Sequence, residues 1–170
     1  MREAFFQFFD ALTQQLTGSE RCSAYFNGEI SDFIRFNKGR IRQPGGVTQR
    51  HCALTLIQGK RHASLSICLT GDPEEDLRRG NAGLQQLRDW IQFIPEDPHL
   101  CLPETVNSTE RLGENQLIAP QQMVDDILSN VTDDDMVGIL ATGSIGCGFA
   151  DSTGQKNWFT AVSYTHLRAH

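Results

Sequence analysis

The sequence predicts an α+β fold in which an antiparallel β-meander packs against amphipathic helices, followed by the start of a second, Gly-rich β region. Three patterns predict it. Apolar residues recur at helical spacing, apolar and polar residues alternate between positions 52 and 69, and glycines gather after position 136. We expect an N-terminal α+β domain over 1–132, the truncated start of the β-rich region over 133–160, and a tail over 161–170.

The first expected element is an amphipathic helix that ends near Gly18. Its apolar side chains fall on one face of a 3.6-residue period. They are Phe5, Phe8, Phe9, Leu12 and Leu16. An aromatic face of this kind is typical of a helix that packs on a core, and glycine is common just beyond a helix C terminus.

Residues 21–69 predict a meander of about four strands. Segments 22–30 and 32–37 are rich in aromatic and β-branched residues. Turn signals stand at Asn27-Gly28, Lys38-Gly39, Pro44-Gly45-Gly46 and Gln58-Gly59-Lys60. In the last hairpin, one strand should bury Cys52, Leu54 and Leu56, and the other Ala63, Leu65, Ile67 and Leu69.

A second helix should begin at Asp72 and continue to Pro95. Asp72 can cap it, Pro73 suits its first turn, and Glu75 stands where a capping box needs a carboxylate. Gly80 and Gly83 cost up to about 1 kcal/mol each relative to alanine, or they allow close packing on the sheet.

The remaining elements are a loop, a third helix and Gly-rich strands. Pro95–Ala119 should form a long surface loop, and Pro120–Val131 a helix with Met123, Val124, Ile127 and Leu128 facing inward. Strands are expected at 137–142 and 145–150, on either side of Gly143-Ser144, and a further strand from Asn157.

Composition indicates a soluble cytoplasmic protein. Hydrophobic residues make up 39% and charged residues 21% of the 170-residue chain, as is usual for globular proteins. No apolar run approaches the roughly 20 residues of a membrane helix, and the N terminus lacks the pattern of a signal peptide. The five cysteines are odd in number and show no CxxC spacing, so we expect reduced thiols.

Charge is distributed unevenly around a net value of −6. Segment 33–71 holds seven basic residues and no acidic one, whereas the rest of the chain holds eight basic against 21 acidic residues. This basic block is consistent with a module that binds nucleic acid. It is equally the pattern of solvated strand edges, and only two aromatic residues, Phe33 and Phe36, are available in it for base stacking.

Several motifs suggest chemistry but lack an essential part. The Gly143–Gly148 stretch has no Gly-Lys-Ser/Thr ending for phosphate. Asp133-Asp134-Asp135 lacks the alternating oxygens and later Glu of a calcium loop. His51 and His62 have no third ligand nearby, and His166-Leu-Arg-Ala-His170 lacks the Glu of a zinc-protease helix. We therefore predict no metal site in this chain.

One polar series remains as a candidate substrate- or partner-binding site. It comprises Arg35, Asn37, Arg40, Arg42 and Gln43, around a tight turn. Arginine and asparagine side chains at such a turn can bind a peptide backbone or a partner subunit through several hydrogen bonds. Turn chemistry with exposed strand charges explains the same residues without a ligand.

Two segments resemble the TldD/PmbA (TldE) family, the so-called modulators of DNA gyrase. SDFIRFNKGRIRQ at 31–43 is similar to the family's N-terminal signature, matching it at Arg35, Phe36, Asn37, Arg40, Ile41 and Gln43. VGILATGSIGCGFADSTGQKNW at 137–158 is similar to its later Gly-rich stretch. The matches are Gly138, Ile139, Gly143, Gly148, Phe149, Ala150, Ser152, Gly154, Gln155, Asn157 and Trp158. Cys147 replaces a common Arg, and Asp151 a common Asn.

The resemblance covers about residues 1–160 and is closer to the PmbA/TldE-like branch. It implies the N-terminal fragment of a zinc metallopeptidase-family protein that acts on unfolded peptides. TldD-type members carry an HExxxH-type zinc motif further along the chain, whereas TldE-type partners commonly lack it and act as non-catalytic subunits of a heteromer. No HExxxH occurs here, so the fragment is expected to be inactive, without cofactor or catalytic residue.

The alternatives are a non-catalytic TldE-like assembly subunit and a nucleic-acid-binding module. Expected partners are a TldD/TldE-type subunit or a second copy, with a peptide substrate in the full assembly; neither membrane nor nucleic acid is expected. The last ten residues, 161–170, resemble a translated sequencing adapter and are predicted to be non-native. Whether the intact protein carries HExxxH depends on sequence beyond them.

Overall fold

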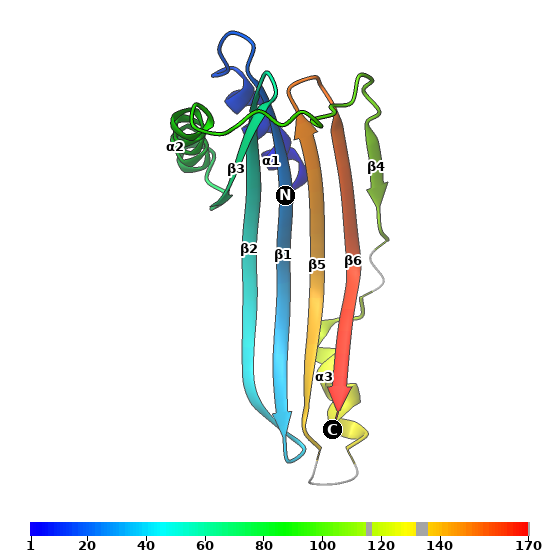
Figure 1. Ribbon diagram of the computed structural model, residues 1–170. Helices are drawn as coiled ribbons and strands as arrows, with labels where there is room; N and C mark the ends of the chain where they lie inside the picture. The colour runs from blue at the N-terminus through cyan, green and yellow to red at the C-terminus, as the bar shows by residue number, and fades with distance from the viewer. Residues whose placement is uncertain (115–116, 132–135, 170) are drawn as a thin grey trace. The chain divides into compact units, whose positions relative to one another are not determined.

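The computed structural model describes residues 1–114, 117–131 and 136–169, with side chains as far as residue 161. The elements are α1 (Arg2–Thr13), β1 (Arg21–Asn37), β2 (Arg40–Gln58), β3 (Arg61–Cys68), α2 (Pro73–Ile91), β4 (Thr109–Leu112), α3 (Pro120–Ser129), β5 (Gly138–Asp151) and β6 (Lys156–Ala169). The strands form one six-stranded sheet in the order β3-β2-β1-β5-β6-β4 (Figure 1). The predicted α+β class is confirmed.

The meander has three strands, not four, because two predicted turns lie inside strands. A Cβ atom added at Gly28 would lie 2.7 Å from the ring of Phe26, and one added at Gly45 would lie 2.6 Å from the ring of Phe33. These glycines therefore make room for aromatic rings, and neither has a positive φ. The predicted turn at Lys38-Gly39 is confirmed, with φ values of 52° and 65°.

The predicted β2–β3 hairpin is confirmed; its apolar face is buried on β2 and, apart from Ala63, only partly buried on β3. The two strands are antiparallel, and Gln58 pairs with Arg61 across a turn in which Gly59 has a φ of 61°. Three pairs of apolar residues lie opposite each other: Cys52 and Ile67, Leu54 and Leu65, and Leu56 and Ala63. The three β2 members are fully buried, as expected of an antiparallel sheet with one covered face.

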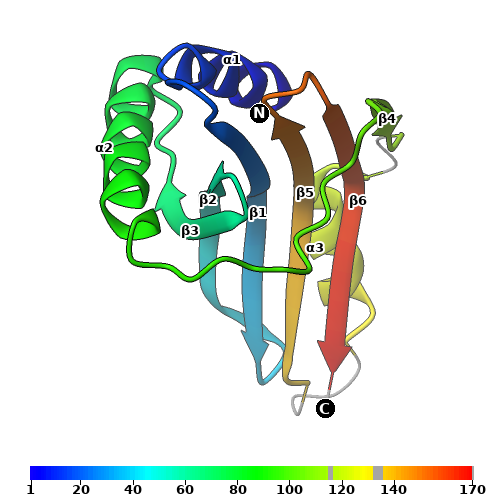
Figure 2. The same ribbon diagram turned by 45° about the horizontal axis from the view of Figure 1, so that its top comes forward.

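The chain divides into two compact units, of which the first comprises Met1–Gly28, Gln49–Arg111 and Gly146–Phe159. In this unit α1 and α2 lie beside one another (Figure 2). The predicted helix glycines allow close packing here, because Gly83 faces Leu65 of β3 and Gly80 faces the ring of Phe8. The buried core of the unit is Phe5, Phe8, Phe9, Leu12, Cys22, Ala24, Phe26, Cys52, Leu54, Leu56, Ala63, Leu69, Leu84, Leu87, Ile91, Ala150 and Trp158.

The start of α2 follows the capping prediction only in part. The Asp72 side chain accepts a 2.8 Å hydrogen bond from the Glu75 amide, as predicted. The Glu75 carboxylate does not return to the cap residue; it binds Arg78 and Arg79 instead, while the Asp72 amide donates to the Thr70 hydroxyl. The helix also ends at Ile91, earlier than predicted.

The second unit comprises Glu29–Thr48, Leu112–Ile145 and Thr160–His170. Its buried apolar residues are Phe36, Met123 and Leu140, with Ile127 and Leu128 packed against them, which confirms the inward face predicted for α3. The predicted break at Gly143-Ser144 is wrong, because β5 is continuous. A Cβ atom at Gly143 would lie 2.5 Å from Ser31 Cα, so this glycine allows close approach of β1 and β5.

The predicted loop between α2 and α3 contains a short strand, β4, at one edge of the sheet. Every residue of β4 is exposed, and its four residues lack the apolar alternation by which strands are recognised in a sequence. Within the described ranges, no helix is both long and apolar enough to cross a membrane.

Candidate functional site

The predicted polar series lies around the β1–β2 turn, in the second unit. All five of its residues are exposed. A pocket of about 370 Å³ beside the turn is lined by Asn37, Lys38, Arg40, Ile41 and Arg42. The structure thus brings Asn37, Arg40 and Arg42 of the series around one hollow, whereas Arg35 and Gln43 lie outside its lining. Their role in binding stays a prediction.

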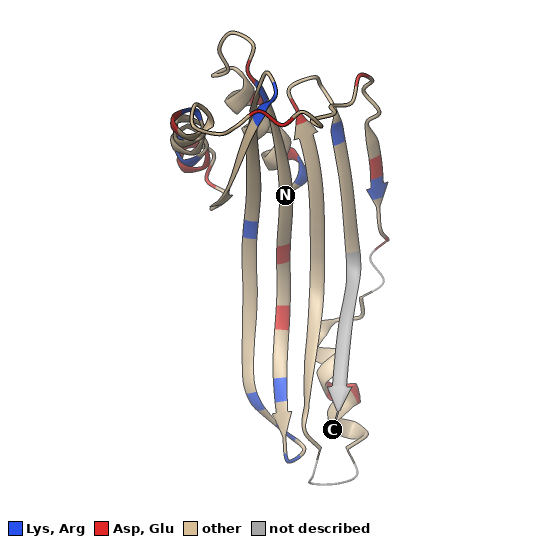
Figure 3. Ribbon diagram, viewed as in Figure 1, with Lys and Arg blue, Asp and Glu red and all other residues tan. Residues whose placement is uncertain are grey.

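This hairpin pocket is cationic. Three of its five lining side chains carry a positive charge, and basic segments are visible at this end of β1 and β2 in Figure 3. Ile41 adds an apolar surface that is 46% exposed. Guanidinium and amide groups donate hydrogen bonds in fixed directions, so the pocket suits carboxylate, phosphate or backbone carbonyl oxygens.

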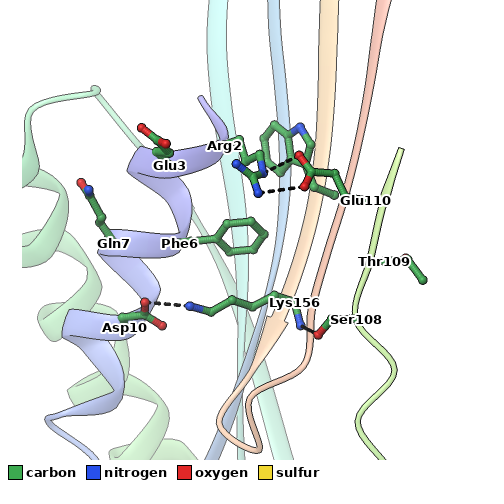
Figure 4. A pocket seen from close by; sticks show the side chains of 10 residues that line it. Arg2, Glu3, Phe6, Gln7, Asp10, Ser108, Thr109, Glu110 and Lys156 are labelled. Carbon is green, nitrogen blue, oxygen red and sulfur yellow. Dashed lines mark hydrogen bonds and ion pairs between the residues drawn. The ribbon is translucent and has the colours of Figure 1, made fainter. Parts of the chain in front are cut away.

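A larger pocket, of about 550 Å³, lies in the first unit and was missed in the sequence (Figure 4). We call it the α1 pocket. Its lining comes from α1, from Ser108 and the start of β4, and from the start of β6: Arg2, Glu3, Phe6, Gln7, Asp10, Ser108, Thr109, Glu110, Lys156 and Trp158. The polar face of α1 was the only signal, because its two cross-pocket ion pairs join residues 108 and 146 positions apart in the sequence.

Two ion pairs span the α1 pocket. Arg2 binds Glu110 through Nε and Nη2, each at 2.9 Å, and Lys156 Nζ lies 2.7 Å from Asp10 Oδ2. The Phe6 ring lies between the two cations, 5.9 Å from the Arg2 guanidinium and 5.4 Å from the Lys156 ammonium. Because the paired side chains are 37–57% exposed, each pair contributes no more than about 1 kcal/mol to stability.

Side-chain amides hold one wall of the α1 pocket in place. Gln155 forms two hydrogen bonds with the backbone of Asn107, accepting from its amide at 2.6 Å and donating to its carbonyl at 2.7 Å. Asn157 donates to the same carbonyl and to the Thr109 hydroxyl. The Ser108 hydroxyl accepts from the Lys156 amide. These contacts attach segment 107–109 to the start of β6.

The turn before β6 is fixed by Asp151, and the strand itself by Trp158. Asp151 Oδ1 accepts hydrogen bonds from the amides of Thr153 and Gln155. Trp158 is 5% exposed, and its ring stacks on Phe26 with centroids 5.7 Å apart. Trp158, which lines the α1 pocket, therefore also belongs to the core of the first unit.

His51 and His62 are kept apart by the register of the β2–β3 hairpin. His51 lies opposite Cys68 and His62 opposite Ile57, and His62 pairs with Asp97 at 3.5 Å. Across the described ranges, no three His, Cys, Asp or Glu side chains gather as a metal site would need. Asp133-Asp134-Asp135 and His170 lie outside the described residues, as does the side chain of His166.

The buried thiols are unsuited to nucleophilic chemistry. Burial raises the pKa of Cys22 and of Cys52 to about 12. A thiol reacts as its thiolate, which neither residue forms near neutral pH. Cys68 and Cys101 are exposed, and all five cysteines are free.

Solved structures share this fold. TldE from Thermococcus kodakarensis aligns with 98% of the chain at a TM-score of 0.58 and 12% identity. The fold is that of TldE. Two proteins described as candidate modulators of DNA gyrase also match. The one from Thermotoga maritima aligns with 98% of the chain at a TM-score of 0.57 and 9% identity. The one from Bacteroides thetaiotaomicron aligns with 94% of the chain at a TM-score of 0.58 and 12% identity. The chain spans 38–43% of the length of these structures. No protein-family model and no curated protein matches the sequence.

The TldE-type fold accounts for both segments on which the family resemblance depends. Segment 31–43 forms the end of β1, its turn and the start of β2; segment 137–158 leads from just before β5 into β6. Gly143 allows β1 and β5 to pack closely. The side-chain amides of Gln155 and Asn157 bind the Asn107 backbone, and Trp158 belongs to the core of the first unit. The resemblance seen in the sequence is confirmed at the level of the fold.

Proposed function

We propose that this chain is the N-terminal part of a TldD/PmbA-type protein, in which it supports assembly and encloses peptide substrate without hydrolysing it. The observation that carries the proposal is the match of 98% of the chain to about two fifths of the TldE structure. Together with the two signature segments, this match supports a region of a longer protein whose chemistry resides elsewhere. The expected partner is a TldD- or TldE-type subunit, or a second copy.

The residues present do not fit the zinc that the family implies. A zinc peptidase needs two imidazoles or equivalent ligands around the metal and a carboxylate that activates its water. His51 and His62 stand at separate positions of the hairpin, with Cys68 and Asp97 as their neighbours. We therefore assign no hydrolytic step to any residue of this chain.

The test is a peptidase assay on the purified chain. Denatured casein is incubated with the protein, with added zinc or with EDTA, and new amino termini are measured. We expect no cleavage above the buffer control in either condition. EDTA-sensitive cleavage that follows the protein through purification would contradict the proposal, because it would require a metal site within the 170 residues.

A second candidate is nucleic-acid binding by the hairpin pocket, and the cluster of Lys38, Arg40 and Arg42 favours it. Phosphate contacts make such binding strongly dependent on salt. Fluorescence anisotropy of a random single-stranded oligonucleotide, titrated at low and at physiological salt, tests it. Binding that disappears in the R40Q/R42Q variant would support this candidate. Absence of binding at low salt would eliminate it.

A further inference from the structure

We propose that the α1 pocket binds a short, extended peptide of three or four residues by its two free termini. The pocket volume of about 550 Å³ lies within the range of about 300–1,000 Å³ that is usual for small-ligand sites. The inference goes beyond the proposed function, because it requires neither zinc nor a partner subunit. All the residues that carry it belong to the first unit.

The spacing of the two ion pairs sets the length of the ligand. Arg2 and Asp10 both lie in α1, and eight residues of helix correspond to about 12 Å along its axis. An extended chain advances about 3.3–3.6 Å per residue, so three to four residues span the same distance. Figure 4 shows the two ion pairs with the Phe6 side chain between them.

Each ion pair keeps hydrogen-bonding capacity for a terminus of the ligand. Arg2 donates a hydrogen bond to Glu110 from Nη2 and holds Nε 2.9 Å from the same carboxylate as an ion pair, and its Nη1 hydrogens can bind a carboxylate. Asp10 accepts from Lys156 at Oδ2, and its Oδ1 can accept from an ammonium group. The peptide carboxylate would therefore lie at Arg2 and its ammonium at Asp10. Both existing pairs would be kept, and charges of opposite sign would alternate through the complex.

The charges and the apolar surface of the pocket select a zwitterion. Two cations and three carboxylates line it, the third being Glu3. A simple anion would meet repulsion from the carboxylates, and a simple cation repulsion from Arg2 and Lys156, whereas a zwitterion satisfies both ends. Phe6, partly buried in the middle of the pocket, can contact the central side chain of the peptide.

The experiment is isothermal titration of the whole chain with the tripeptide Ala-Phe-Ala and with its N-acetylated, C-amidated form. We expect a Kd of about 1 mM for the free tripeptide. The blocked form should bind at least tenfold more weakly, since it lacks both charges. Binding of the free form should also weaken as sodium chloride is raised.

Two variants locate the site. Asp10→Asn removes the ammonium contact at an exposed position, and we expect it to weaken binding of the free tripeptide about tenfold. Glu75→Gln removes a comparable carboxylate from α2, outside the pocket, and should leave the affinity unchanged. Equal affinity for the free and blocked peptides would overturn the proposal. Unchanged affinity of the free tripeptide for Asp10→Asn would also overturn it. The tetrapeptide Ala-Phe-Ala-Ala is titrated as the longer probe, and failure of both free peptides to bind would overturn the proposal as well. None of these results depends on peptidase activity.

Discussion

The two units of this molecule differ in what stabilises each of them internally. Among the described residues, the apolar core of the first unit has 17 buried members, including four phenylalanines and a tryptophan. The core of the second unit has three buried members among the side chains that the structure describes. Burial of apolar area is the main favourable term in folding. We infer that the first unit is stabilised by its core, whereas the second depends more on strand pairing and on close backbone approach.

Strand β1 shows this difference within one element. Over 22–28, every second residue is buried, namely Cys22, Ala24, Phe26 and Gly28. Over 29–37, only Ser31 and Phe36 are buried. The same β-strand geometry is therefore supported by a packed face in its first half and by little apolar packing in its second half.

The largest expected effect comes from removal of the central aromatic residue of the first unit. Trp158→Ala should reduce the free energy of unfolding by about 4 kcal/mol, since it deletes a buried indole that contacts Phe5 and Phe26. Urea denaturation followed by circular dichroism measures it. Phe159→Ala, at a position 39% exposed, is the matched control and should cost far less. Equal losses would contradict the account of this core.

Close backbone approach in the second unit is tested by Gly143→Ala. The added Cβ would contact the Ile30 carbonyl oxygen and the Ser31 backbone, so we expect a loss of about 2–3 kcal/mol, as for an overpacked site. Gly46→Ala is its control in the same unit, because there the nearest atom is a side-chain oxygen of Asp32 at 3.3 Å. If urea denaturation shows the two variants to be equally stable, the proposed importance of this approach is wrong.

A smaller, pH-dependent effect is expected at Glu20 in the first unit. Arg88 donates two 2.8 Å hydrogen bonds to this carboxylate and holds the pKa of Glu20 below its ordinary value of 4.5. The pair therefore stabilises the fold above that pH, and its contribution is lost as the pH falls through the lowered pKa. Glu20→Gln should cost about 2 kcal/mol at pH 7.

The same substitution should lose its effect as the pH falls through the lowered pKa of Glu20. Thermal unfolding of wild type and Glu20→Gln, compared in steps from pH 7 into acid, measures the difference. Glu75→Gln breaks a more exposed pair with Arg78 and should cost less at pH 7. A Glu20→Gln effect that is independent of pH would show that the ion pair is not its cause.

Elements with a strong local signal could be predicted from the sequence. The apolar faces of α1 and α3, the Asp72 cap and the alternation of the β2–β3 hairpin all agree with the structure. The predicted turns or breaks at Gly28, Gly45 and Gly143 were wrong. At these positions the missing side chain leaves space for an aromatic ring or for the backbone of the neighbouring strand. Such a role depends on residues that only the fold brings close.

The sites differ in predictability for the same reason. The hairpin pocket gathers residues within six positions of sequence, so a pattern search could find most of it. The α1 pocket joins Arg2 to Glu110 and Asp10 to Lys156, and no local pattern links such distant residues. The roles of Gln155 and Asn157 were likewise hidden, since their partner at Asn107 lies in a segment predicted to be loop.

The most direct test of the difference between the units is native-state hydrogen exchange, measured by NMR along β1. We predict that the amides of Ala24 and Phe26, whose side chains are buried in the larger core, exchange only through global unfolding. The amides of Ile34 and Phe36, beside the three-residue core, should exchange at least tenfold faster through local opening. Equal protection along the whole strand would contradict the claim that the two units are stabilised differently.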